Sequence, residues 1–301
     1  MIVKSRRVRG LRELCTLLGY TPQAFYQYDR LAQKRVLRED LLLQQVLDHR
    51  TRQPRLESRK LHLMLAPFML NHGIHLGRDG FFELLRSQGL LIRKRRLGTR
   101  TTFSRHRFKK YPDLFKGAMV YRADQVWVSD ITYIRVGKGF AYLSLVTDVY
   151  SRKIIGYALL ADLSARGPEA ALQMAISQRR SYQGLLHHSD RGCQYCSDGY
   201  TTLLRENRIA ISMTQSGDPR DNAIAERVNG ILKGELLENS FTNLTRARLA
   251  VKEAIMVYNQ HRPHSSVDML TPAVAYTTQG ELARRWKSYY KKAAKEVSMD
   301  G

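Results

Sequence analysis

Three acidic residues in this chain lie in three different kinds of segment, and a fold that uses them together must bring those segments to one place. Asp130 falls within a run rich in β-branched residues, Asp190 follows a short apolar run, and Glu226 lies in a stretch of helical character, with 35 residues between Asp190 and Glu226. Carboxylates gathered in this way are the ligands that hard divalent cations prefer. Two such ions about 3.5–4 Å apart can activate an attacking oxygen and stabilise a leaving oxygen in phosphodiester chemistry. The three acids therefore predict a site for two Mg²⁺ ions, which Mn²⁺ should be able to replace.

The charge balance of the chain indicates a polyanionic partner. The 50 Lys and Arg residues against 27 Asp and Glu give a formal net charge of +23 over 301 residues. Nucleic acid is the commonest polyanion that such proteins bind. Ribosomal proteins and proteins of membrane surfaces share this balance, so charge by itself leaves those classes open.

Membrane insertion and secretion are not indicated by the sequence. It contains no run of about 18 apolar residues, and the N-terminal M-I-V-K-S-R-R-V-R-G lacks the apolar core of a signal peptide. Three Cys residues in a chain of this length do not make a disulfide framework. We therefore expect no membrane partner and a protein of a reducing compartment.

Residues 1–33 are predicted to form an N-terminal helical segment. A short apolar pattern ends at Gly19, and a second helix is expected to begin at Thr21 and Pro22, because Pro tolerates the first helical turn. The result is either a small helix-turn-helix or a docking helix pair.

Residues 34–97 carry apolar residues at helical spacing and are predicted to form a helix-turn-helix DNA-binding domain. Pro67 should end or kink one of its helices near residue 66. Asp79 should cap the following helix, and we expect Arg78, at the start of that helix, to contact DNA.

A basic linker is expected over residues 98–120. The stretch 84–112 contains ten Lys or Arg residues and no acid. Each phosphate that such residues neutralise releases a counterion, whereas the simpler interpretation is a solvated charged segment. We favour DNA contact by four residues in this stretch: Arg93, Lys94, Arg95 and Arg96.

Residues 121–276 are predicted to form a mixed α/β domain. The β-rich runs are 125–135, 141–149, 153–160, 185–189 and 209–213. The helices are expected over 167–179, from 197 onward and over 221–237. Three strands followed by alternating helices and strands predict a mixed five-stranded sheet with helices, an order similar to that of the ribonuclease-H-like architecture. The remaining residues, 277–301, are expected to form a basic tail that makes weak DNA contact.

Each of the three acids also has a simpler interpretation. Alternation in its strand places Asp130 on a face with Val126 and Val128, where an unpaired acid is costly; the alternative is an acid that faces outward. Asp190 lies where open α/β sheets hold ligands, although alone it would be an ordinary turn residue. Order and spacing together favour a site over three unrelated surface acids.

Glu226 opens a helical face that two further polar residues share. Asn229 and Lys233 follow at i+3 and i+7 and project in the same direction. We interpret Glu226 as a metal ligand, with Asn229 and Lys233 meeting the DNA. A solvated surface stripe is the alternative.

Four stretches resemble insertion-sequence transposases, in particular the OrfB product of the IS-three-type elements within the retroviral-integrase superfamily. They are Trp127–Tyr133, H-S-D-R-G-C-Q-Y from His188, N-A-I-A-E-R-V-N-G-I-L-K from Asn222, and Y-N-Q-H-R-P-H-S-S-V-D-M-L-T-P at Tyr258–Pro272. The resemblance covers roughly residues 10–276 and includes a helix-turn-helix segment ahead of the catalytic core. Pro67 departs from the uninterrupted helix common in that segment.

The resemblance implies that Asp130, Asp190 and Glu226 form the triad of a DNA transposase, and that Lys233 contacts the transposon end. It implies metal-dependent cleavage and strand transfer at terminal inverted repeats, with target DNA as a second partner. Because two ends must be held together, we expect at least a homodimer on DNA, and an upstream-frame protein is a further candidate partner. The expected location is the bacterial cytoplasm, at the nucleoid.

Further motifs carry less weight. A zinc site is one interpretation of four residues close in sequence, namely His187, His188, Cys193 and Cys196. Structural zinc sites draw their ligand pairs from two separated segments, so small core cysteines are the preferred interpretation. The H-R-P-H sequence is interpreted as a polar loop that binds DNA or the core, with Arg262 and His264 as candidate DNA contacts. No phosphate-binding G-x-x-x-x-G-K-[ST] is present.

Two other functions remain open on the sequence alone. One is a DNA-binding regulator in which the helical N-terminal half acts alone. The other is a structure-specific nuclease of the same fold, which would cut DNA without joining it.

Overall fold

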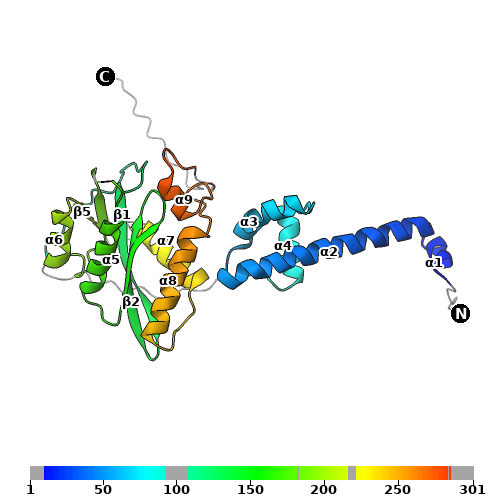
Figure 1. Ribbon diagram of the computed structural model, residues 1–301, viewed down its shortest axis with the longest axis horizontal. Coiled ribbons are helices and arrows are strands. Elements are labelled where there is room, and N and C mark those ends of the chain that lie inside the picture. Colours follow the sequence, from blue (N-terminus) through cyan, green and yellow to red (C-terminus); the bar gives the residue numbers. More distant parts are fainter. Residues whose placement is uncertain (1–9, 93–107, 182, 216–221, 284, 286–301) are drawn as a thin grey trace, which may run out of the picture. The chain divides into compact units, whose positions relative to one another are not determined.

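The computed structural model describes residues 10–92, 108–181, 183–215, 222–283 and 285. The chain divides into two compact units, Met1–Arg93 and Lys94–Gly301. Elements of both units are labelled in Figure 1. Each unit is described by itself.

The first unit is helical, as the apolar spacing predicts. Its helices are α1 (Leu11–Leu17), α2 (Pro22–Arg52), α3 (Ser58–Asn71) and α4 (Arg78–Ser87). The Thr21 hydroxyl accepts the backbone N–H of Ala24 at 3.1 Å and so caps α2. Since α2 runs unbroken for 31 residues, the boundary expected between residues 33 and 34 falls inside one helix.

A small core joins the C-terminal half of α2 to α3 and α4. Buried apolar residues of the three helices form it: Leu42, Val46, Leu56, Leu61, Leu65, Met69, Phe81, Leu84 and Leu85. Pro67 does not end its helix, because α3 continues to Asn71 while Leu65 and Met69 hold it in the core on either side. Asp79 is not the cap of α4 either, because that position belongs to Gly77. Its carboxylate pairs instead with Arg78 at 2.8 Å.

The second unit contains a five-stranded sheet in the order β3-β2-β1-β4-β5. The strands are β1 (Val126–Val136), β2 (Gly139–Asp148), β3 (Ile154–Leu160), β4 (Leu186–Ser189) and β5 (Ala210–Met213). The first three pair antiparallel, while β4 and β5 run parallel to β1. The predicted α/β class and the mixed five-stranded sheet are confirmed.

Helices cover both faces of this sheet (Figure 1). They are α5 (Arg166–Ser177), α6 (Asp198–Glu206), α7 (Ala223–Ile231), the π-helical turn η2 (Leu232–Leu236), α8 (Leu244–Gln260) and α9 (Pro272–Thr277). One core cluster joins Trp127, Val146 and Ile155 to α5 and α6. The opposite cluster joins β1, β2 and β3 to α7, η2 and α8. Each helix is short and amphipathic, so the sheet between these two layers is what buries its apolar side.

The helix expected over 221–237 begins at Ala223 and changes its winding near the end. Residues 232–236 form η2 instead of continuing as an α-helix. A π-turn contains an extra residue and is frequent at functional sites, whereas apolar spacing in the sequence cannot distinguish it from an α-turn.

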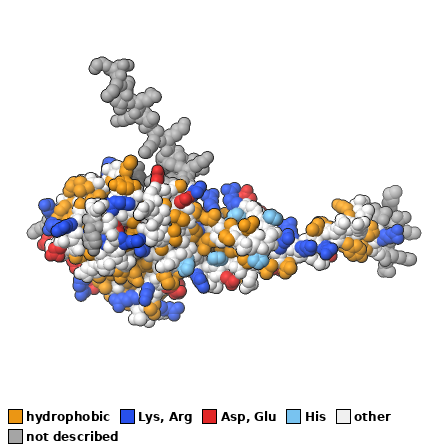
Figure 2. All heavy atoms as spheres, turned by 45° about the horizontal axis from the view of Figure 1, so that its top comes forward, with side chains coloured by type: hydrophobic (Ala, Val, Ile, Leu, Met, Phe, Trp, Pro, Cys, Tyr) orange, Lys and Arg blue, Asp and Glu red, His pale blue; other side chains and the backbone are white. Residues whose placement is uncertain are grey.

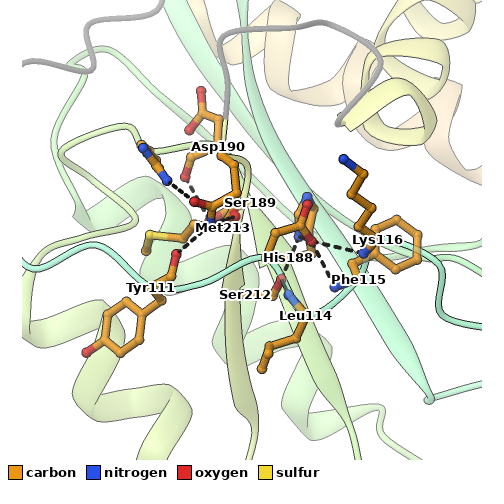
Figure 3. A network of polar contacts seen from close by, with 12 residues as sticks. Tyr111, Leu114, Phe115, Lys116, His188, Ser189, Asp190, Ser212 and Met213 are labelled. Carbon is orange, nitrogen blue, oxygen red and sulfur yellow. Dashed lines mark hydrogen bonds and ion pairs between the residues drawn. The ribbon is translucent and has the colours of Figure 1, made fainter.

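Part of the expected linker belongs to the second unit. Residues 98–107 lie outside the described part of the chain. Beyond them, Leu114 donates its backbone N–H to Ser212 Oγ at 2.8 Å, and Met213 donates to the carbonyl of Pro112 at 3.2 Å. Phe115 packs against a core cluster. A free linker would make none of these contacts, so this part of the chain is a surface layer on β5 (Figure 3).

Candidate active site

The parallel pairing of β1 and β4 brings two of the predicted acids together. Val128 lies opposite His188 in the register, and Asp130 and Asp190 each follow two residues later. Partners in a parallel register point to the same face, so the two aspartates leave the sheet at one level and on one side. Asp190 stands at the upper end of β4 in Figure 3, just beyond Ser189.

A tight turn fixes Asp190 after the strand ends. Its Oδ1 accepts the backbone N–H of Gly192 at 2.9 Å, and its carbonyl accepts the Ser189 hydroxyl at 3.0 Å. A Cβ at Gly192 would lie 2.9 Å from the same Oδ1. A side chain at this position would therefore push the Asp190 carboxylate aside.

Helix α7 is tied to β1 beside Asp130. Asn222 Nδ2 donates to the Ser129 carbonyl at 3.0 Å, and Asn229 Nδ2 donates to Asp130 Oδ2 at 2.7 Å. Both asparagines are buried. Glu226 lies between them in the first turn of α7 and is exposed. The third acid therefore belongs to the same region as Asp130, on a helix that two amide groups hold in place.

Negative charge accumulates at this site. The pKa of Asp130 is raised to about 7, most strongly by burial, next by the charge of Asp190, and to a smaller extent by Glu226. The hydrogen bond from Asn229 opposes the rise. A cation would offset both the burial of this carboxylate and its repulsion from the neighbouring acids, so the electrostatics of the site fit a divalent metal.

The chemistry of the available donors also fits a hard cation. All three acids offer oxygen ligands, and the Oδ1 atoms of Asn222 and Asn229 are buried without a hydrogen-bond partner. Within the described residues, no three His, Cys, Asp or Glu side chains are already placed to hold one metal ion. Asp130 and Asp190 are partly buried whereas Glu226 is exposed. The Glu226 side chain therefore has to turn inward to complete such a site.

Lys233 lies near the acids on the continuation of the same helix. Its Nζ donates to Thr132 Oγ1 at 3.3 Å. Burial lowers the pKa of this ammonium, and the charge of Asp130 opposes that effect. The side chain is half-buried, so its charge is directed by the fold and can meet a phosphate beside the acids.

Arg262 and His264 are placed differently from the prediction. Arg262 is 1% exposed and His264 is 8% exposed, and the Arg262 guanidinium is paired with Glu235 at 2.8 Å. Neither side chain reaches the surface as a DNA contact would. The prediction for these two residues is corrected accordingly: Arg262 and His264 belong to the core, whereas His261 is exposed.

The other predicted DNA contacts are Arg78, in the first unit, and the basic stretch 93–96. Arg78 is exposed at the first position of α4 and pairs with Asp79. Arg93, Lys94, Arg95 and Arg96 lie outside the described residues.

Asn222 is a site residue that the sequence prediction missed. Only its place immediately before the helix, four residues ahead of Glu226, could have drawn attention to it. Its bond to the Ser129 carbonyl joins residues far apart in the chain, so that role depends on the tertiary fold.

The raised pKa of Asp130 predicts that Asp130→Asn stabilises the metal-free protein. The folded state favours the protonated form, so the natural chain loses stability as pH rises from about 4 to about 7. The variant lacks this charge and keeps an oxygen to accept from Asn229. Three pKa units set an upper limit of about 4 kcal/mol, and we expect a rise in Tm of about 3–8 °C at pH 8 that disappears toward pH 4. Thermal unfolding followed by circular dichroism in EDTA measures this, and an equal or lower Tm at pH 8 would contradict it.

Among the helices of the described residues, none is long and apolar enough to span a membrane.

Comparison with known proteins places this geometry in a family. Two family models described as "Integrase core domain" match residues 120–219 and 207–272. The transposase for insertion sequence element IS629 of Shigella sonnei is 30% identical over 287 residues, covering 91% of this chain and 94% of that protein. Transposase InsF for insertion sequence IS3A of Escherichia coli is 32% identical over 191 residues, covering 62% of this chain and 66% of that protein. A structure of the HTLV-2 integrase catalytic core domain in complex with magnesium covers 52% of this chain and 97% of that chain, with 18% identity and a TM-score of 0.39.

The matched residues span the sheet, the acids and helices α5 to α8, and the full-length relative extends the match through the N-terminal unit. The chain therefore belongs to the insertion-sequence transposases of the IS-three type within the DDE integrase superfamily, which are enzymes of DNA transposition.

Proposed function

We propose that Asp130, Asp190 and Glu226 together hold two Mg²⁺ ions, which Mn²⁺ can replace, and that the chain cleaves DNA at the terminal inverted repeats of its element and joins the freed end to target DNA. The observation that carries the proposal is the placement of the acids: Asp130 and Asp190 each follow the paired Val128 and His188 of β1 and β4 by two residues, and Glu226 lies on the helix that Asn229 fixes to Asp130. The raised pKa of Asp130, to which Asp190 and Glu226 contribute, fits this placement. Two carboxylates on or just after neighbouring parallel strands, with a third on the helix bound to β1, are suited to a pair of cations.

Two ions bound there would lower the pKa of a water or orient a 3′-hydroxyl for in-line attack, and would stabilise the leaving oxygen. The residues of the chain fix the positions of the carboxylate oxygens that would hold the ions. Asn229 holds one oxygen of Asp130 at 2.7 Å and so fixes the direction of this carboxylate. The Gly192 turn fixes one oxygen of Asp190 through a backbone N–H. No residue has to form a covalent bond to DNA, because the reaction exchanges one phosphodiester for another and depends on positioning and electrostatics.

DNA approaches this site along positively charged surface. Lys and Arg side chains are spread over the visible face of both units (Figure 2), in keeping with the net charge of +23. Lys233 meets a phosphate of the transposon end. Asn229, which is buried and donates to Asp130, holds that acid in place and does not meet the DNA. Arg78 on α4 and the basic stretch from Arg93 to Arg96 are further DNA contacts in this proposal.

Transposition requires two ends in one complex, so the active form is at least a homodimer on DNA. An upstream-frame protein is the further partner that we propose, and the bacterial cytoplasm, at the nucleoid, is the proposed location. Sizing a complex formed on labelled element ends, with and without that protein, tests both partners. A complex containing a single copy of the chain that still joins DNA would exclude the dimer.

Metal removal tests the proposed reaction. With duplexes taken from the DNA that flanks the coding sequence, cleavage and joining should be lost in EDTA and restored by Mg²⁺ or Mn²⁺, because three carboxylates cannot activate an oxygen without a cation. Gel analysis of the labelled products measures both steps. Cleavage without joining of a free 3′-hydroxyl would indicate the structure-specific nuclease, and binding without any metal-dependent cleavage would indicate the regulator.

A further inference from the structure

The corner that follows α8 buries an arginine. The backbone N–H groups of His261 and Arg262 both donate to the carbonyl of Val257, at 3.0 and 3.1 Å, and so turn the chain. Arg262 is among the largest fully buried side chains of the described residues. A buried guanidinium is tolerated only when acceptors surround it, so Arg262 must be paired with an acceptor group within the protein.

That partner is Glu235. Arg262 Nε donates to Glu235 Oε2 and Nη2 donates to Oε1, both at 2.8 Å, while Nη1 donates to the Pro263 carbonyl at 3.3 Å. Two parallel bonds between a planar guanidinium and a carboxylate fix direction as well as distance, which a lysine cannot do. The pair therefore fixes the orientation of the corner after α8 relative to η2.

Glu235 lies in η2, the wide turn that continues α7. The N–H of Leu237 donates to the carbonyl of Leu232 at 2.8 Å, which is the five-residue spacing of a π-helix, and both leucines are buried. A π-turn holds one residue more than an α-turn, so it rotates the residues within it relative to the helix that precedes them. Such a turn is rare because it is less stable than an α-turn, and the bidentate pair is a contact that supports it from outside.

The direction of Lys233 depends on this turn. Asn229, before η2, donates to Asp130, and Lys233, within η2, donates to Thr132; both acceptors lie on β1. Only Gly234 separates Lys233 from Glu235. The α7–η2 helix is thus fixed to β1 through Asn229 and Lys233 and to the Arg262 corner through Glu235. Because only Gly234 lies between Glu235 and Lys233, a displacement of Glu235 also displaces Lys233.

We propose that Arg262 is a positioning residue for transposition: by holding Glu235 it keeps η2 wound as a π-turn and directs Lys233 at the DNA end. The inference rests on the proposed function, since it concerns the same site, and Arg262 itself does not touch DNA. Loss of the two-bond geometry lets η2 relax toward α-helical winding. Lys233 then turns away from the DNA, while Asp130 stays on β1 and Asp190 stays in the turn after β4.

A double-mutant cycle in the full chain tests the coupling. Arg262→Lys and Lys233→Ala are made separately and together, and the Kd for a fluorescent duplex cut from the DNA that flanks the coding sequence is measured by anisotropy. We expect each single variant to weaken binding by about three- to tenfold, and the double variant to bind no more weakly than Lys233→Ala alone. A lysine that already points away from the DNA has no contact left to lose.

Effects that multiply in the double variant would overturn the proposal, as would a Lys233→Ala variant that binds normally. Val251→Ala is the matched control, because Val251 is a buried core residue of α8 whose apolar side chain forms neither a hydrogen bond nor an ion pair with Arg262 or Glu235; Lys233→Ala should keep its full effect in that background. If Arg262→Lys does not fold by thermal unfolding, Glu235→Gln replaces it in the cycle under the same two outcomes. Failure of the proposed function is a separate result, namely normal strand transfer by Asp130→Asn.

Discussion

Strand transfer is expected to fall by at least about a thousandfold when any one of the three acids loses its charge through Asp130→Asn, Asp190→Asn or Glu226→Gln. Each substitution keeps the size and polarity of the side chain but removes a charged metal ligand, and metal-dependent charge stabilisation provides most of the expected acceleration. Joining of a labelled end in Mg²⁺ measures the rate. End binding should change little, because these residues do not neutralise phosphates.

The matched controls are acids of the same unit that lie on the surface. Asp198 is exposed at the start of α6 and Glu253 is exposed on α8, so Asp198→Asn and Glu253→Gln should retain nearly full activity. Near-normal strand transfer by any one triad variant would remove that residue from the catalytic assignment. A parallel loss in the controls would instead indicate a general sensitivity to charge.

Gly156→Ala should strongly destabilise the catalytic unit, because the added methyl group has no space between the sheet and α5. Gly156 is buried in β3, opposite Val146 on β2, and a Cβ there would lie 2.0 Å from the carbonyl oxygen of Ala171 in α5. That atom belongs to the backbone of a packed helix, so α5 itself must move. Overpacking of this kind costs about 3 kcal/mol or more, which corresponds to a loss of about 6–12 °C in Tm.

Gly139→Ala provides the control for this prediction. Gly139 is exposed at the start of β2, and a Cβ there would meet its nearest atom at 4.0 Å, so the change in stability should stay within about 0.5 kcal/mol. Thermal unfolding of both variants measures the difference. A Gly156→Ala protein with the Tm of the natural chain would show that α5 does not pack against β3 this closely.

The order of elements in the catalytic unit followed from local patterns in the sequence. The alternation around Asp130 predicted a strand over 125–135, and the structure has β1 at Val126–Val136. Ser197 was expected to begin a helix, and its hydroxyl accepts the N–H of Tyr200 at 3.4 Å at the start of α6. Such signals are readable because alternation and capping depend on residues close together in the chain.

The N-terminal unit shows where local signals misled. Pro67 removes a hydrogen bond from α3, and yet the helix continues because Leu65 and Met69 are buried on either side of it. The turn residues near Gly19 do separate α1 from α2, but nothing separates residues 33 and 34. Packing against other helices keeps α3 helical past Pro67 and α2 helical past residue 33. Rules based on neighbouring residues in the sequence do not take such packing into account.

The sequence by itself determined the strands, most helices and the three acids, because these depend on the period and the chemistry of neighbouring residues. Only the tertiary structure decided that Arg262 is buried against Glu235, that residues near Leu114 lie along β5, and that η2 is a π-turn. Each of these features joins segments that are distant in the chain or depends on support from such a segment. Contacts of that kind form only when the whole sheet and its helices exclude water together, and no short stretch of sequence contains that information.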